Sequence, residues 1–199
     1  MHTSTNKTAL EALLLDIGAC TLCSAHLPHA PRPVLTAGVK ARLLIIGQAP
    51  GTRVHTSGIP WNDPSGDRLR QWLGLCEEQF YNQENIAIMP MGFCYPGKGK
   101  SGDLPPRPEC AKTWHQRVLQ LLPEVRCTLL IGQYAQRHYL DDDYATLQER
   151  VKNWQDYAPE YFVLPHPSPR NHLWRQRNPW FETKIVPALR KTVKELLEL

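Results

Sequence analysis

Four short runs of aliphatic and aromatic residues mark this chain, at residues 41–46, 85–89, 127–131 and 161–164. Each run is mostly apolar, so the side chains on both of its faces are expected to be buried. Strands inside a parallel sheet have this pattern, whereas strands with one solvent-exposed face alternate apolar and polar residues. The four runs therefore predict four buried strands.

Between these runs, apolar residues recur three or four positions apart, which predicts helices that cover the sheet. Helices are expected to begin at Thr8, Ser65, Glu109, Gln133 and Pro179, the last of them kinked at Pro187. Alternating strands and helices predict an α/β fold, a three-layer sandwich with a four-stranded parallel sheet flanked by helices. The 199 residues contain no evident linker or repeat, so we expect one domain over residues 1–199.

Charge and composition exclude some classes of protein. The chain has 23 Lys and Arg against 19 Asp and Glu, a net charge of +4 that suits a nucleic-acid partner without demonstrating one. No apolar run is long enough to span a membrane, and the N-terminus lacks the pattern of a signal peptide. We therefore expect a cytoplasmic protein with no membrane partner.

Two of the predicted strands end in loops with candidate chemistry. The first strand runs into Gly47–Gly51, which reads GQAPG, and the fourth into Leu164–Asn171, which reads LPHPSPRN. Open α/β folds keep their sites at the carboxyl ends of strands, where His166 is expected to lie. A proline-rich turn with a surface histidine is the plainer alternative for the second motif. The long loop over residues 91–108 is a further candidate, because long loops in compact domains are usually functional or disordered.

Four of the six cysteines are spaced as metal ligands. Cys20 and Cys23 form a CxxC pair, and Cys94 and Cys110 bracket the long loop. Four thiolates from two segments can bind either an iron–sulfur cluster or a structural zinc, and the spacing does not choose between them. Core or redox thiols are the alternative to a metal site. Such a site would tie the N-terminal segment to the loop over residues 91–110.

Taken together, these motifs resemble the uracil-DNA glycosylase superfamily, over about Cys20 to Trp180. The closest likeness is to the iron–sulfur family 4 type of bacteria and archaea, whose first motif, GEAPG, is similar to GQAPG here. The HPSPRN form of the second motif and the loop Gly58–Asp63, which reads GIPWND, are similar to those of single-strand-selective glycosylases. The cysteine order and spacing also look like the cluster ligands of family 4.

The resemblance implies a monomeric, monofunctional enzyme that flips a deaminated base, above all uracil, out of single- or double-stranded DNA and hydrolyses its N-glycosidic bond. It implies that His166 stabilises the leaving base and that Trp61 stacks on it, with a core aromatic as the alternative role of Trp61. It also implies a 4Fe–4S cluster, with zinc as the alternative, in a bacterial or archaeal cell. The residues expected beside the base are Gly47, Ala49, Pro50, Gly51, Trp61 and Asn62. Those expected to contact DNA are Ser168, Arg170, Asn171, Leu173 and Trp174, the last two or Arg170 as a wedge.

The chain departs from its relatives at three positions. Gln48 stands where family 4 has Glu, and Ala49 where family 1 has Asp, so motif 1 has no general base. Gln48 can orient water, and we expect Asp63 to position the water or the sugar cation, with a helix cap as its alternative role. Pro90 stands at the position where the family recognises uracil with an Asn side chain. Either Asn62 or Gln48 reads the base, or the substrate contains hypoxanthine or xanthine.

Two rivals belong to other classes of protein. A catalytically silent cluster protein would bind DNA or RNA in a salt-sensitive way without forming abasic sites. An unrelated metal-binding scaffold would have no affinity for DNA.

Overall fold

The computed structural model describes residues 2–199, with side chains from residue 5 onward. Its centre is a four-stranded sheet in the order β2-β1-β5-β6, and every neighbouring pair of strands is parallel. The strands are β1 (Leu43–Ile46), β2 (Ile86–Ile88), β5 (Cys127–Ile131) and β6 (Tyr161–Leu164). All four coincide with the apolar runs of the sequence, so the predicted fold class is confirmed.

Both faces of the sheet are covered, because alternate residues of each strand enter different cores. Leu43 and Ile45 of β1 pack on one side, and Leu44 and Ile46 on the other. All four side chains are fully buried. Burial of an aliphatic side chain of this size contributes about 1.5–3 kcal/mol, so β1 anchors both cores.

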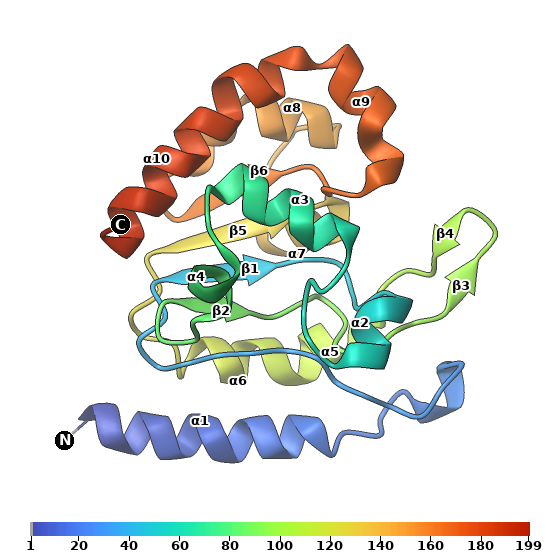
Figure 1. The fold of residues 1–199 in the computed structure, drawn as a ribbon. Helices are drawn as coiled ribbons and strands as arrows, with labels where there is room; N and C mark the ends of the chain where they lie inside the picture. The colour runs from blue at the N-terminus through green and yellow to red at the C-terminus, as the bar shows by residue number, and fades with distance from the viewer. Residues whose placement is uncertain (1) are drawn as a thin grey trace.

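The helices form the two outer layers (Figure 1). One face is covered by α3 (Pro64–Leu73), α8 (Leu147–Lys152) and α10 (Val186–Leu197). The other is covered by α1 (His2–Gly18), α6 (Gln116–Leu119) and α7 (Gln133–Tyr139). The remaining α-helices are α2 (Thr52–Ser57), α4 (Glu77–Tyr81), α5 (Pro108–Cys110) and α9 (His172–Arg177). Short 3-10 turns cover Ser24–His26, Trp154–Tyr157 and Pro169–Asn171.

Several predicted helix boundaries were wrong. The first helix begins at His2 rather than at Thr8, because extending a helix by a residue costs far less than starting one. The second begins at Pro64, with Asp63 as its N-cap in place of Ser65. The polar loop after motif 1 contains α2, which the absence of an apolar pattern concealed.

Two helices are interrupted by π-helical turns. The helix expected from Glu109 starts at Pro108 and passes through a π turn at Ala111–His115 before α6. A second π turn, Phe181–Ile185, directly precedes α10, whose first turn holds Pro187. Proline has no N–H to donate to the residue four positions earlier, so the irregularity falls beside the predicted position.

A small hairpin emerges from the long loop after β2. Its strands are β3 (Lys98–Gly99) and β4 (Gly102–Asp103), which pair antiparallel. The hairpin projects beyond the end of the sheet at which β1 ends, on the same side as α2 (Figure 1). None of the described helices is long and apolar enough to cross a membrane.

Candidate functional site

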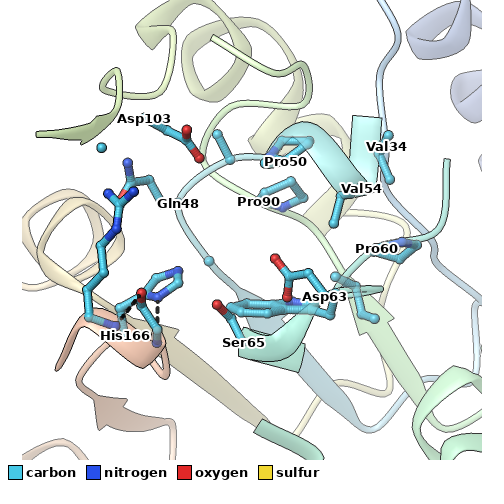
Figure 2. A pocket seen from close by; sticks show the side chains of 18 of the residues that line it. Val34, Gln48, Pro50, Val54, Pro60, Asp63, Ser65, Pro90, Asp103 and His166 are labelled. Atoms are coloured by element: carbon cyan, nitrogen blue, oxygen red, sulfur yellow. Dashed lines mark hydrogen bonds between the residues drawn. The ribbon is translucent and has the colours of Figure 1, made fainter. Parts of the chain in front are cut away.

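A cavity of about 440 Å³ lies at the carboxyl edge of the sheet (Figure 2). Its walls come from the loops after β1, β2 and β6, from the starts of α2 and α3, and from the hairpin. Parallel strands bring their carboxyl ends to one edge, and this is why motifs far apart in the sequence meet here. The predicted site residues that line it are Gly47, Gln48, Ala49, Pro50, Gly51, Trp61, Asp63, His166, Ser168, Arg170 and Asn171.

His166 lies two residues beyond the end of β6 and presents a neutral ring to the cavity. Its Nδ1 accepts a hydrogen bond from the Ser168 backbone N–H at 3.2 Å. The neutral ring therefore carries its proton on Nε2, as a donor. Burial lowers the pKa of His166, and the negative charge of Asp63 only partly opposes this. The Asn171 side chain donates to the His166 carbonyl oxygen at 2.8 Å and fixes the turn.

Trp61 forms one wall in a strained backbone conformation, with a φ of 57° in the left-handed region. Its ring centroid lies 5.6 Å from that of His166. A Cβ on Gly47 would come within 2.7 Å of the Trp61 ring, so the glycine permits this close packing. The Tyr81 hydroxyl donates to the Pro60 carbonyl oxygen at 3.0 Å and holds the loop. Trp61 thus packs against the core and also faces the cavity.

Asp63 caps the start of a helix, which was the alternative role expected from the sequence, and it also lines the cavity. Its Oδ1 accepts from the Gly66 backbone N–H at 2.8 Å, which caps the start of α3. Its Oδ2 lies 4.0 Å from the position that a Cβ on Gly51 would take. The capping bond therefore occupies one carboxylate oxygen, while the other points toward motif 1.

The hairpin supplies a site residue that sequence reasoning missed. The carboxyl group of Asp103 faces the cavity, above Gln48 in the view of Figure 2. Burial and the negative charge of Asp63 raise the pKa of Asp103, while the positive charge of Arg170 opposes the rise. The length of the loop marked it as a functional candidate, but no local pattern singled out this aspartate.

Pro90 lines the cavity after β2, and its backbone is held by a buried histidine. His115 is 2% exposed. Its Nε2 donates to the Pro90 carbonyl oxygen at 3.1 Å, and its Nδ1 accepts from the Tyr139 hydroxyl at 2.6 Å. The ring also stacks on Phe93. The wall at Pro90 thus has a fixed backbone but no side-chain donor.

This buried histidine should make the fold sensitive to acid. The pKa of an unfolded histidine is about 6.5, and burial lowers that of His115 to about 4. The stability that the neutral ring contributes is complete above pH 6.5 and is lost as the pH falls toward 4. Between pH 7.5 and pH 5 we expect this residue to cost roughly 2 kcal/mol of unfolding free energy.

The matched variant is His115→Gln, which keeps an N–H donor for Pro90 but does not titrate. Urea unfolding of both proteins at the two pH values measures the difference. Equal acid losses in the two proteins would show that His115 does not carry the effect.

The four predicted metal ligands converge on one small cavity. Cys20, Cys23, Cys94 and Cys110 all line it, and all are free thiols. Burial raises the pKa of Cys94 to about 11 and that of Cys110 to about 12. Over residues 2–199, no three His, Cys, Asp or Glu side chains are grouped so as to hold a single metal ion.

Three predicted residues lie outside the main cavity. Asn62 is exposed on the loop before α3. Leu173 is 52% exposed on α9, whereas Trp174 packs against Trp180 and Phe181 with ring centroids 5.9 and 5.7 Å away. Of the two apolar wedge candidates, Leu173 is therefore the one whose side chain is exposed and free to enter DNA.

An open α/β sandwich with a histidine donor and carboxylates in a strand-end cavity defines a protein with an enzyme-like site. Residues 35–190 match the family model of the uracil DNA glycosylase superfamily, and the chain belongs to this superfamily. Among solved structures, the chain is similar to the NMR structure of a protein from Methanosarcina acetivorans described as a "putative Uracil DNA glycosylase". That match has 15% identity and a TM-score of 0.45, and it covers 80% of this chain and 98% of the other.

Proposed function

We propose that this protein is a DNA repair glycosylase that flips a deaminated base, uracil in the first place, and hydrolyses its N-glycosidic bond. The observation that carries the proposal is the neutral His166 ring, whose Nδ1 is occupied and whose Nε2–H remains as a donor at the cavity. Membership of the uracil DNA glycosylase superfamily supports it. The product would be an abasic site in bacterial or archaeal cytoplasmic DNA.

The reaction places opposite charges on the two fragments. The base leaves with the bonding electron pair as an anion, and the sugar becomes cationic. A donor aimed at the developing oxyanion lowers this barrier, and His166 Nε2 has that role. The Asp63 carboxylate, with one oxygen turned toward motif 1, stabilises the sugar cation. The Trp61 face stacks on the base, beside the backbone of Gly47–Gly51.

The residues that line the cavity favour hydrolysis without a second, lyase step. A lyase reaction needs an amine nucleophile to form a Schiff base. Among the described residues, no lysine lines this cavity. We therefore propose a monofunctional enzyme.

The wall of the cavity that would contact the base is mostly apolar. Val34, Val54, Ile88 and Pro90 supply no side-chain donor there. The Gln48 amide nitrogen donates to the Leu104 carbonyl oxygen at 3.5 Å, which leaves its oxygen to accept from a ring N–H. Uracil, hypoxanthine and xanthine each carry such an N–H. Glycosylases for the two purines are therefore the second candidate function.

The DNA backbone would pass the loop after β6. Ser168, Arg170 and Asn171 line the cavity on the side of this loop. Arg175 donates to the Ser168 carbonyl oxygen at 3.3 Å and supports this turn. Phosphate contacts of this kind position the duplex, and Leu173 would fill the gap left by the flipped base.

We propose a 4Fe–4S cluster at the four cysteines, as in family 4 glycosylases. Thiolates bound to one zinc ion each lie about 2.3 Å from it and so lie close together. A cluster binds each thiolate through a different iron and suits thiols that are spread around a cavity. Cys20, Cys23, Cys94 and Cys110 line one small cavity, and this shared lining supports a group bound by all four. The cluster would tie the N-terminal segment to the 91–110 loop, making residues 1–199 one domain.

Anaerobic purification with iron and sulfide analysis tests the cluster. Cys94→Ser should lower the bound iron and the melting temperature, because an oxygen ligand replaces one thiolate. The control is Cys76→Ser, at an exposed cysteine outside this cavity. Stoichiometric zinc in place of iron, or unchanged iron in Cys94→Ser, would contradict the proposal.

Oligonucleotides that carry uracil, hypoxanthine or xanthine, single- and double-stranded, test the activity. Alkali-revealed strand breaks are expected with wild-type protein and should form at least about 100-fold more slowly in His166→Ala. The preferred oligonucleotide identifies the base. Salt-sensitive DNA binding without breaks would instead establish a catalytically silent binding protein.

A further inference from the structure

We propose that Asp103 is a further catalytic residue of this site and takes the proton from the attacking water. The inference rests on the proposed glycosylase activity and assigns a residue to a step that motif 1 cannot perform. Gln48 and Ala49 have no ionisable side chain, so the base must come from elsewhere in the fold.

Asp103 reaches the cavity from the hairpin, on the side of Gly51. Its Oδ2 lies 3.4 Å from the position that a Cβ on Gly51 would take, and the Oδ2 of Asp63 lies 4.0 Å from the same point. The two carboxylates thus face one spot beside motif 1. A larger residue at position 51 would fill the space between them.

Three hydrogen bonds fix the hairpin relative to the other motifs. Arg170 donates to the Ser101 carbonyl oxygen at 3.2 Å, which joins the hairpin to the loop of His166. Gln48 donates to the Leu104 carbonyl oxygen at 3.5 Å, which joins it to motif 1. The Leu104 N–H donates to the Gly97 carbonyl oxygen at 2.8 Å and closes the hairpin base. Asp103 is therefore placed by the same residues that line the cavity.

The two carboxylates differ in what they can still accept. The Asp63 Oδ1 already accepts the capping N–H of Gly66 at the start of α3. Within residues 2–199, the Asp103 carboxyl group has no hydrogen-bond or ion-pair partner. The pKa of Asp103 is raised above that of an ordinary aspartate, and this makes its carboxylate a stronger base. These differences assign the fixed charge to Asp63 and the proton transfer to Asp103.

The water oxygen forms a bond to C1′ while the bond from C1′ to the base nitrogen breaks, and that electron pair leaves with the base. One water proton passes to the Asp103 carboxylate. The base anion, stabilised by His166, later takes a proton from solvent, and Asp103 returns its own.

Single-turnover cleavage by Asp103→Asn tests the step. Loss of a general base typically costs about 100- to 10,000-fold, and we expect a loss within that range. Asp103→Glu should recover part of the rate. Wild-type activity should fall as the pH drops through the Asp103 pKa, and Asp103→Asn should lack that fall. The control, Asp141→Asn, makes the same change at an exposed aspartate outside the cavity.

A second measurement does not depend on the identity of the base. It compares affinity for DNA with a cationic pyrrolidine sugar against DNA with a neutral tetrahydrofuran sugar. Wild-type protein should prefer the cationic sugar, because it resembles the transition state. Asp103→Asn should reduce that preference at least about tenfold, because the cationic ring N–H loses the carboxylate that accepts its proton, while the fixed charge of Asp63 remains.

The outcomes separate this inference from the proposed function. If wild type cleaves, His166→Ala is at least about 100-fold slower, and Asp103→Asn stays within about threefold of wild type, Asp103 is not catalytic. If wild type cleaves no base, the proposed function fails and the role of Asp103 fails with it. Where wild type cleaves, a preference for the cationic sugar that falls in Asp103→Asn supports the role of Asp103, and a preference unchanged in that variant overturns it.

Discussion

Replacing His166 by alanine should slow single-turnover base release by about 100- to 1,000-fold, as expected for loss of one oxyanion donor. The Nδ1 of this ring is held by the Ser168 N–H, so the Nε2–H is lost as a donor at the cavity when the ring is removed. Affinity for tetrahydrofuran DNA should change little, because the donor acts mainly on charge that develops in the transition state.

The matched variant is His166→Gln, which retains an N–H donor on a shorter side chain and should recover part of the rate. Single-turnover kinetics with saturating enzyme measure both variants. Unchanged base release by His166→Ala would show that another group stabilises the leaving base.

Gly66→Ala should both destabilise the fold and displace Trp61. A Cβ on Gly66 would lie 2.6 Å from the Trp61 carbonyl carbon and closer still to its oxygen. The neighbour is backbone, which cannot rotate away, so the loop before α3 must move. Overpacking typically costs about 1–3 kcal/mol, and we expect a loss at the upper end of that range. Displacement of Trp61 should also raise KM for the damaged DNA.

Gly18→Ala provides the control, because a Cβ at Gly18 meets no atom within 4 Å. Urea unfolding and steady-state kinetics compare the two variants with wild type. Wild-type stability in Gly66→Ala would mean that the Trp61 loop tolerates the added methyl group and that its conformation is not fixed by this contact.

The loop before α3 combines structure and chemistry in a few residues. Asp63 caps the helix with one carboxylate oxygen and turns the other toward motif 1. Trp61 closes one wall of the cavity while it packs on the core below. Folding of α3 and formation of the cavity wall are therefore coupled, and changes at this loop should affect both.

The sequence by itself determined the sheet and the position of its principal motifs. Runs that are apolar on both faces are typical of strands inside a covered sheet, and the helical connections between them are those that parallel strands require. Parallel strands end at one edge, which brings Gln48 and His166 to the same cavity. The cysteine spacing likewise anticipated which four thiols share a cavity.

Only the tertiary structure decided the details of the site. It turns Asp103 into the cavity, leaves Asn62 outside it, and packs Trp174 against the core while Leu173 stays exposed. The periodicity of apolar residues indicates which face of a helix or strand is buried. The direction of a loop side chain depends on contacts with segments far along the chain, such as the bond from Arg170 to Ser101. No local pattern encodes those contacts, because they exist only once the strands have assembled.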